Sequence, residues 1–338
     1  MARVLIEASA PTRIDLAGGT IDIWPLYLFH HRAQTLNAAI SLRARCTVAP
    51  RDDRRIVIRS EDTGVTVEAT GWPELLERPE LKLLGRLLHF FEADGLELTT
   101  RSDSPVGAGI AGSSALNIAV CGALARWRGL DLAADTLLQI AMNVEAQAID
   151  VPTGVQDYRP ALFGGVSAVE LRVDGVRRVP LDLDPAEIER RLVLAYTGAS
   201  RNSGLNNWEI TKRHIDGDAA VFAHFERIRD VAVAMRAAIE ARDWDEVGRQ
   251  LALEWENRKG LAPGVTTPLI EDLIDRATRA GATAAKVCGA GGGGCLVAFA
   301  PPDRVQAVRE ALAAGGARVL DYRVETEGLR VATQPRLR

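Results

Sequence analysis

A glycine-rich turn between a predicted strand and a predicted apolar helix constrains this chain more than any other feature. The strand is expected over residues 96–100, the turn over 105–112 and the helix over 113–127. Glycine lets a backbone approach a ligand closely, and successive free amides form a concavity that binds anions. The positive end of the helix points at the same place. The sequence therefore predicts a phosphate-binding loop, although a serine-capped turn without a ligand would use the same residues.

The glycines of this turn also match the dinucleotide pattern GxGxxG, at Gly107, Gly109 and Gly112, and an acid follows at Asp131. That pattern belongs to a strand–turn–helix unit that opens a parallel sheet. Here the residues before the turn are typical of β-hairpins, and the turn begins with a Ser-Pro pair. The Walker pattern GxxxxGK[ST] is absent. We therefore discount both of these nucleotide folds and keep the phosphate-binding loop.

Composition narrows the class of protein. A length of 338 residues suggests about two domains, and 47% hydrophobic with 25% charged residues is typical of a globular chain rather than a disordered one. A formal net charge of −4 lacks the basic excess of nucleic-acid-binding proteins. No apolar run approaches the ~18 residues of a membrane span, and no targeting segment is recognisable. Four cysteines without a CxxC pair predict reduced thiols in the cytoplasm.

The spacing of apolar residues predicts an α+β fold. Residues 4–6 and 14–17 are expected to be strands separated by a turn at 10–12, and more strands follow before the glycine turn. A stretch rich in proline and acids, 181–186, is the candidate boundary, so the expected domains are 1–182 and 183–338. The second has the strand–helix–strand order of an α+β sandwich. Its expected strands are 192–196, 284–287, 295–300 and 318–323, and its expected helices are 206–214, 219–241, 244–258, 268–279 and 302–314.

Two other segments carry glycine near charged residues. Residues 289–294 hold five glycines in six positions between two predicted strands, more than a hairpin needs. Each glycine costs ~0.5–1 kcal/mol of backbone entropy, so we expect this backbone to lie near a ligand. Residues 10–22 combine Arg13, Asp15 and Asp22 with two adjacent glycines. A single one of these charged residues would be interpreted as a solvated surface group. The cluster becomes a candidate for function because the other two turns also indicate a ligand site.

Together the three segments resemble the signatures of the GHMP kinases, a family named for galactokinase, homoserine kinase, mevalonate kinase and phosphomevalonate kinase. Residues 11–18 match P-x-R-[IVL]-x-L-x-G, and residues 286–294 follow K-x-[ST]-G-x-G-G-G-G. Residues 105–115 follow P-x-G-x-G-L-[GSA]-S-S-A with one extra residue. Within the family, the chain resembles most the bacterial heptose-phosphate kinases. The supporting segments are residues 13–20, 154–158, 163–165, 196–201 and 255–259.

The resemblance implies a two-domain GHMP kinase fold, with an N-terminal ribosomal-S5-like β/α domain and a C-terminal ferredoxin-like α+β domain. It also implies ATP-dependent phosphorylation of a small-molecule hydroxyl. Asp157 matches the catalytic aspartate, which would accept the hydroxyl proton or orient the hydroxyl. Arg13 matches a basic residue near the transferred phosphate. Glu145 matches an acid that binds Mg²⁺, and the short spacing between Glu145 and Asp157 could bring both acids to one site.

The remaining site residues follow from the same motifs. The implied ATP-binding positions are Pro105, Gly107, Ala108, Gly109, Ile110, Ala111, Gly112, Ser113 and Ser114. The implied substrate-binding positions are Gly19, Thr20, Asp22, Gly154, Gly291 and Gly292. Ser113 is also a candidate Mg²⁺ ligand beside Glu145.

The chain departs from the family pattern at several positions. Without a gap, Gly112 replaces the first serine of the central motif, and with one inserted residue the Ser-Ser pair falls at Ser113 and Ser114. The serine that contacts Mg²⁺ therefore stays open. Cys288 replaces a Ser or Thr before the glycines, and Ile21 stands where close relatives have threonine. The candidate cations for a second phosphate on the acceptor are Arg201, Lys212, Arg213 and Arg258, and His30 and His31 are interpreted as surface or packing residues.

The leading hypothesis is a kinase that transfers the γ-phosphate of ATP to a hydroxyl of a sugar or sugar phosphate, with a heptose 7-phosphate-like acceptor favoured. One alternative is an anomeric sugar kinase that resembles galactokinase or fucokinase. Less favoured are a diphosphomevalonate-type decarboxylase and a non-catalytic sensor of ATP and sugar with the same fold. ATP and Mg²⁺ are the expected cofactors. The expected partner is the small-molecule acceptor, with no nucleic acid or membrane, and the protein is expected to be a monomer or a homo-oligomer.

Overall fold

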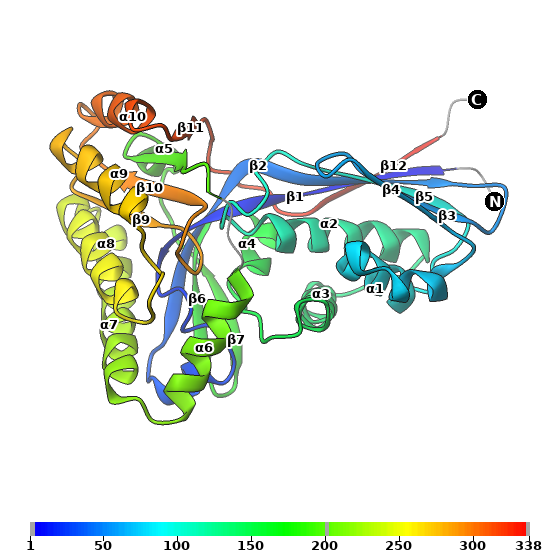
Figure 1. The fold of residues 1–338 in the computed structure, drawn as a ribbon, viewed down its shortest axis with the longest axis horizontal. Coiled ribbons are helices and arrows are strands. Elements are labelled where there is room, and N and C mark those ends of the chain that lie inside the picture. The colour runs from blue at the N-terminus through cyan, green and yellow to red at the C-terminus, as the bar shows by residue number, and fades with distance from the viewer. Residues whose placement is uncertain (1–3, 200–202, 336–338) are drawn as a thin grey trace.

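Two β-sheets with helices on their faces form the molecule (Figure 1). It is known from a computed structural model that describes residues 4–199 and 203–335. The first sheet has eight strands within these residues, in the order β12-β1-β2-β5-β3-β4, and β6 pairs with both β2 and β7. Its strands are β1 (Val4–Ala17), β2 (Gln34–Pro50), β3 (Ile56–Ser60), β4 (Val65–Ala69), β5 (Leu96–Ser102), β6 (Val166–Arg172), β7 (Gly175–Pro180) and β12 (Arg330–Pro335).

Two long strands, β1 and β2, run through the first sheet and reach both lobes of the molecule (Figure 1). The turn expected at residues 10–12 is wrong, because β1 is continuous from Val4 to Ala17. Its register against β2 shifts between Pro11 and Thr12. Proline has no N–H to donate to a strand ladder, so its presence suggested a turn. Here it is tolerated inside a strand because it lies at a register shift.

Helix α2 (Gly112–Trp127) packs directly on one face of the first sheet, and α1 (Lys82–Phe90) and α3 (Ala134–Ile149) pack against α2. Alternate residues of the strands, such as Ile6 and Ala8, face these helices and form the largest apolar cluster. Helix α2 is buried along most of its length because α1, α3 and the sheet surround it. Its first residues, at the end of the central glycine turn, are thereby held rigidly.

The second sheet is antiparallel, in the order β11-β8-β10-β9. Its strands are β8 (Leu192–Tyr196), β9 (Ala284–Val287), β10 (Cys295–Phe299) and β11 (Arg318–Leu320). Alternating residues face opposite sides: Leu194 packs against α7 (Ala219–Ala241) and α8 (Trp244–Lys259), and Ala195 packs against α9 (Pro268–Arg279) and α10 (Val305–Ala314). The order β8, helices, β9, β10, α10, β11 is that of a ferredoxin-like α+β unit.

Short elements complete the structure. They are η1 (Leu26–Phe29), η2 (Trp72–Glu77), η3 (Pro79–Leu81), α4 (Tyr158–Phe163), α5 (Pro185–Glu189) and α6 (Ser203–Ile215). The predicted α+β class is confirmed by the two sheets and the helices that pack on them. The boundary after residue 182 stays a prediction. The sequence patterns missed β12, which returns from the end of the chain to pair with β1.

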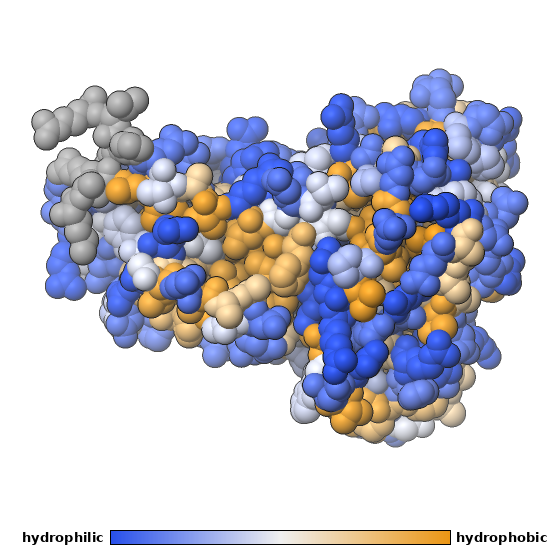
Figure 2. Space-filling view, turned by 180° about the vertical axis from the view of Figure 1, so that it is seen from behind, coloured by the Kyte–Doolittle hydropathy of each residue, from blue (hydrophilic) through white to orange (hydrophobic). Residues whose placement is uncertain are grey.

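Seen from behind, hydrophilic residues cover most of the lobe that carries the second sheet (Figure 2). Apolar residues gather near the middle of the lobe built on the first sheet. Among residues 4–199 and 203–335, no helix combines the length and apolar character that crossing a membrane requires.

Candidate active site

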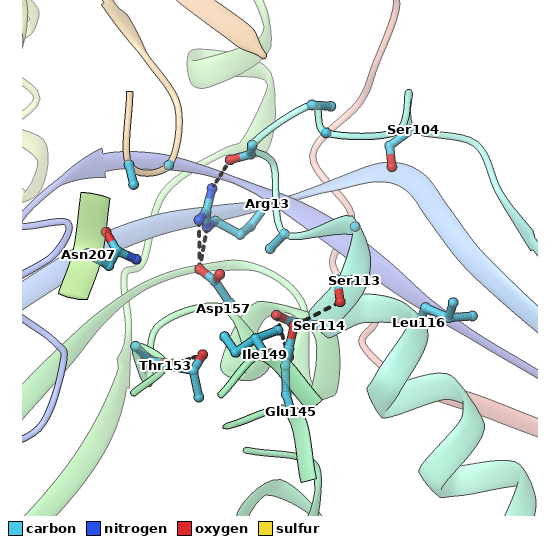
Figure 3. Close-up of a pocket in the computed structure, with 18 of the residues that line it drawn as sticks. Arg13, Ser104, Ser113, Ser114, Leu116, Glu145, Ile149, Thr153, Asp157 and Asn207 are labelled. Carbon is cyan, nitrogen blue, oxygen red and sulfur yellow. Dashed lines mark hydrogen bonds and ion pairs between the residues drawn. The ribbon is translucent and has the colours of Figure 1, made fainter. Parts of the chain in front are cut away.

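A cavity of about 410 Å³ lies where the central glycine turn, the end of α3 and the segment before α4 meet (Figure 3). Most residues predicted for the site line it: Arg13, Thr20, Asp22, Pro105, Gly107, Ala108, Gly109, Ala111, Gly112, Ser113, Ser114, Glu145, Gly154 and Asp157. Four predicted residues are outside its described lining: Gly19, Ile110, Gly291 and Gly292. Segments far apart in sequence therefore meet at one place.

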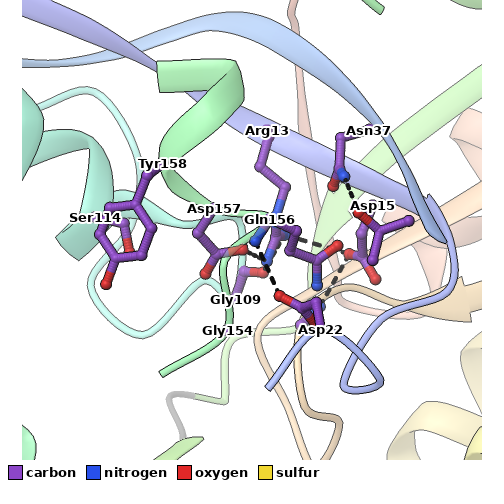
Figure 4. A network of polar contacts seen from close by, with 12 residues as sticks. Arg13, Asp15, Asp22, Asn37, Gly109, Ser114, Gly154, Gln156, Asp157 and Tyr158 are labelled. Atoms are coloured by element: carbon purple, nitrogen blue, oxygen red, sulfur yellow. Dashed lines mark hydrogen bonds and ion pairs between the residues drawn. The ribbon is translucent and has the colours of Figure 1, made fainter. Parts of the chain in front are cut away.

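The predicted catalytic pair is in direct contact. Nε and Nη2 of Arg13, on β1, donate hydrogen bonds of 2.9 and 2.7 Å to Oδ1 of Asp157 (Figure 4). Asp157 immediately precedes α4, and its side chain keeps 26% of its surface exposed. The second carboxylate oxygen receives no bond from Arg13 in this arrangement. The pair thus offers the cavity a carboxylate that is held in a fixed orientation.

A buried ion network holds Arg13 in turn. Nη1 of Arg13 donates to Gly109 O at 3.0 Å and to Asp15 Oδ1 at 3.2 Å. Lys286, on β9, donates to Asp15 Oδ2 at 2.9 Å. Burial alone would raise the pKa of Asp15, but Lys286 and Arg13 hold it below its usual range. Burial likewise lowers the pKa of Arg13, and Asp157 and Asp15 outweigh that effect and raise it. Sequence reasoning assigned no role to Asp15 or Lys286, although both lie inside the motifs.

The central turn forms the phosphate end of the cavity. Three of its residues adopt positive φ: Gly107 at 70°, Gly109 at 72° and Ala111 at 62°. Ala111 directly precedes α2 and lies in the left-handed region, which costs a non-glycine residue about 1–2 kcal/mol. Backbone amides around such turns form the concavity that the sequence predicted.

Most of the second glycine segment lies behind this turn, and only its first two residues, Gly289 and Ala290, line the cavity. The amide of Cys295 donates to Ala108 O at 2.7 Å. A Cβ placed on Gly294, whose φ is +83°, would come within 2.7 Å of the same Ala108 oxygen. Gly291 similarly leaves no room for a Cβ beside the Val265 carbonyl. These glycines permit close packing between protein backbones, and a role of Gly291 and Gly292 in substrate binding stays a prediction.

Three hydroxyl groups converge on the Glu145 carboxylate. Ser113 donates to Oε1 at 2.8 Å, while Ser114 and Tyr158 donate to Oε2 at 3.0 and 2.7 Å. Burial raises the pKa of Glu145, and these hydroxyl donors oppose the rise. Ser113 is exposed, whereas Ser114 and Tyr158 are buried. The Oε1 side of the carboxylate and the Ser113 hydroxyl therefore present oxygen atoms toward the cavity (Figure 3).

At the other end of the cavity lies Asp22, which is 1% exposed. Its Oδ2 accepts a 2.9 Å hydrogen bond from the backbone N–H of Gln156. Burial, and next the charge of Asp157, raise the pKa of Asp22 to about 6. Gly154 makes this approach possible, since a Cβ there would lie 2.2 Å from Oδ2 of Asp22. Gly19 similarly leaves space for the Arg258 guanidinium, whose Nη2 donates to Gly289 O.

Of the described candidate cations for a second phosphate on the acceptor, one lines the cavity and two do not. Arg258, on α8, lines the cavity. Lys212 forms an ion pair with Asp216, and Arg213 forms one with Asp218. Neither cation is among the described residues that line the cavity. Arg201 lies outside the described residues. Sequence reasoning missed Asn207, a lining residue on α6 that carries no motif signal.

The two adjacent histidines differ in environment. His30 is buried, with Nδ1 2.6 Å from Oε1 of Glu226 and Nε2 2.8 Å from Nε2 of His214. His31 is exposed. The interpretation of His30 as a packing residue agrees with this placement.

Family models match both halves of the chain. The GHMP kinases N terminal domain matches residues 80–165, and the GHMP kinases C terminal model matches residues 235–318, together about half of the chain. This chain belongs to the GHMP kinases. The relatives described next are kinases of this family, and the chain is an ATP-dependent phosphotransferase.

Relatives matched along nearly the whole of this chain support the membership. A D-glycero-alpha-D-manno-heptose 7-phosphate kinase of Campylobacter jejuni is 29% identical over 96% of this chain and 98% of the relative. An L-fucokinase/L-fucose-1-P guanylyltransferase of Bacteroides fragilis is 26% identical over 97% of this chain but 38% of its own length. A crystal structure of a D-glycero-D-manno-heptose 1-phosphate kinase from Bacteroides thetaiotaomicron superposes with a TM-score of 0.78, at 26% identity, over 97% of this chain and 98% of that one.

Proposed function

We propose that this GHMP kinase transfers the γ-phosphoryl group of ATP to a hydroxyl of a sugar or sugar phosphate, with a heptose 7-phosphate-like acceptor favoured. The observation that carries the proposal is the Arg13–Asp157 pair, on the wall of a cavity with a glycine turn at one end and Asp22 at the other. The similarity to heptose-phosphate kinases along nearly the whole chain supports the choice of acceptor.

The chain's own residues divide the work of transfer. Backbone amides of residues 105–112, with the N-terminus of α2, would bind the phosphates of ATP. Asp157 would accept the proton of the attacking hydroxyl or orient that hydroxyl, which is the role of a positioned carboxylate in phosphoryl transfer. Arg13 fixes Asp157 and places positive charge where the transferred group gains negative charge. Thr20 and Asp22 would bind acceptor hydroxyls.

Mg²⁺ is the expected second cofactor, and the residues fit it. This ion takes oxygen ligands and binds through one or two carboxylates together with substrate phosphates. Glu145 and Ser113 offer a carboxylate and a hydroxyl of this kind, 2.8 Å apart. Bound Mg²⁺ would offset the charge of the phosphates. Ser114 and Tyr158 would hold the carboxylate from its buried side.

The remaining expectations belong to the same proposal. We keep a cytoplasmic location, the absence of nucleic-acid and membrane partners, and a monomer or homo-oligomer as predictions. Four buried cysteines without disulfides agree with a reducing compartment.

A panel of acceptors tests the proposal. ADP release is measured with sugars, sugar phosphates and mevalonate derivatives, in the presence of ATP and Mg²⁺. We expect release with at least one sugar or sugar phosphate and a phosphorylated sugar as product. Phosphate at the anomeric position would instead support the galactokinase- or fucokinase-like alternative. Release of CO₂ from a diphosphomevalonate substrate, or bound ATP without any ADP release, would contradict the proposal.

A further inference from the structure

Three buried polar atoms without partners gather at one end of the active-site cavity. They are Oε1 of Gln156, Oδ1 of Asn207 and Nη1 of Arg258, none of which has a hydrogen-bond partner among the described residues. All three side chains line the same cavity. A buried polar group without a partner is costly, so its presence calls for an explanation. Three in one cavity indicate a ligand that completes them.

The three residues come from separate parts of the fold and meet beside the predicted acceptor positions. Gln156 lies between Gly154 and Asp157, and its backbone N–H donates to Oδ2 of Asp22. Asn207 extends from α6 toward Arg13 and Asp157 (Figure 3). Arg258 on α8 lies against Gly19, next to Thr20.

Their chemistry selects a ligand class. Two of the unpaired atoms, on Gln156 and Asn207, are amide oxygens, which accept hydrogen bonds, and the third is a cationic donor. A carboxylate group or a fully ionised phosphate group by itself has no hydrogen to offer the two amide oxygens. A hydroxyl group both donates and accepts, so a ligand with several hydroxyls completes all three atoms at once.

Charge at this end of the cavity supports the same class. Asp22 and Asp157 are carboxylates, whereas the described lining contains two cations, Arg13 and Arg258. Arg13 already donates to two carboxylates and a carbonyl. The net charge therefore does not favour an acceptor whose binding group is a carboxylate, as in mevalonate.

We propose that Gln156, Asn207 and Arg258 determine acceptor specificity by binding the hydroxyl groups of a polyhydroxylated ring. This inference rests on the proposed function and deepens it. It assigns the selection of sugars over carboxylate-bearing acceptors to three side chains that lie outside the three glycine motifs, at 11–18, 105–115 and 286–294.

Asn207→Leu is the principal test, because Asn207 is half-buried and leucine keeps its size. Binding is measured by calorimetry with a non-hydrolysable ATP analogue present, so that no transfer is needed. The probes are D-mannose, D-galactose, L-fucose, their phosphates and mevalonate. The tightest-binding sugar is then compared with its singly deoxygenated analogues. Glu209→Gln, at an exposed position on the same helix, is the matched control.

We expect Asn207→Leu to weaken binding of the sugar by about 5- to 100-fold and to leave binding of one deoxy analogue unchanged. Gln156→Met should give the same pattern with a different analogue, since each amide serves a different hydroxyl. The control should bind every probe as the wild type does. Thermal unfolding of each variant separates misfolding from loss of recognition.

Three results would overturn the inference: equal loss across all analogues, no loss in either variant, or a wild-type protein that binds mevalonate but no sugar. Failure of the proposed function looks different. In that case the wild type binds a sugar with the expected pattern but transfers no phosphate to it.

Discussion

The two ends of the cavity are built differently. At the phosphate end, one continuous turn is followed directly by α2, and Glu145 already receives three hydroxyl bonds. At the acceptor end, the wall comes from β1, the segment before α4, α6 and α8, and it contains three unpaired polar atoms. Among the described residues, no buried side-chain atom of the first end lacks a partner, whereas the second end is completed by its ligand.

The difference teaches where specificity resides. A rigid turn built from one continuous segment suits a substrate shared by the whole family, such as ATP. An end assembled from distant segments can change one side chain at a time without disturbing the turn. Variants at the two ends should therefore affect different quantities.

Asp157→Asn is expected to have the largest effect, because Asp157 stands between the two ends. Turnover should fall by about 10²- to 10⁴-fold, since the amide cannot accept the hydroxyl proton. ATP binding, measured by calorimetry, should change little. Near-normal turnover would remove Asp157 from the chemistry.

Gly294→Ala tests whether the second glycine segment supports the phosphate turn from behind. Gly217→Ala is the matched control, because Gly217 has a similar φ of +86° and nothing within 4 Å of an added Cβ. Both variants incur backbone strain, but only Gly294→Ala forces a methyl group against Ala108 O. We expect Gly294→Ala to lower the free energy of unfolding by about 1–3 kcal/mol more than the control in urea titrations. It should also weaken ATP binding. Equal losses of stability in both variants would refute the supporting role.

Ser113→Ala and Ser114→Ala separate the two serines at the same end. Ser113 is exposed and Ser114 is buried, although both donate to Glu145. Loss of Ser113 should raise the Mg²⁺ concentration for half-maximal activity by about 10-fold. Ser114→Ala should mainly reduce stability, seen in thermal unfolding. A larger Mg²⁺ effect in Ser114→Ala would reverse the assignment.

The acceptor end should show its own pH dependence. Asp22 has a pKa raised to about 6, so it loses its negative charge as the pH falls through 6. The protonated form offers hydroxyls a weaker acceptor. We expect kcat/KM for the acceptor to fall about tenfold per pH unit below this value. The KM for ATP should not change over this pH range. Asp22→Asn should lower the activity and abolish the fall of kcat/KM below pH 6. If the variant shows the same fall of kcat/KM below pH 6, a group other than Asp22 causes it.

Local motifs were predictable from sequence, and long-range pairings were not. The turn at residues 105–112 carries its own signal, because glycine spacing and the following helix are adjacent in the chain. The Asp15–Lys286 contact joins residues 271 positions apart, so nothing local indicates it. Strand β12 pairs with β1 across almost the whole chain and has little apolar alternation of its own. Pro11 suggested a turn where tertiary pairing imposes a strand.

The acceptor end shows the same limit most clearly. Asp22, Gly154 and Asp157 were identified through motif resemblance, and the cavity brings them together. Asn207 was not identified, because an asparagine in an amphipathic helix has no distinguishing pattern. Its meaning comes only from its position opposite Asp157 (Figure 3).

A single-turnover transfer experiment tests the central claim most directly. The wild-type protein and Asp157→Asn are each mixed with ATP labelled at the γ-phosphate, Mg²⁺ and the best sugar or sugar phosphate from the acceptor panel. The label is then followed by mass spectrometry. The account predicts that the wild type moves the label onto a hydroxyl of the sugar, whereas the variant binds ATP and leaves the label there. Label released only as inorganic phosphate, or equal transfer by both proteins, would contradict it.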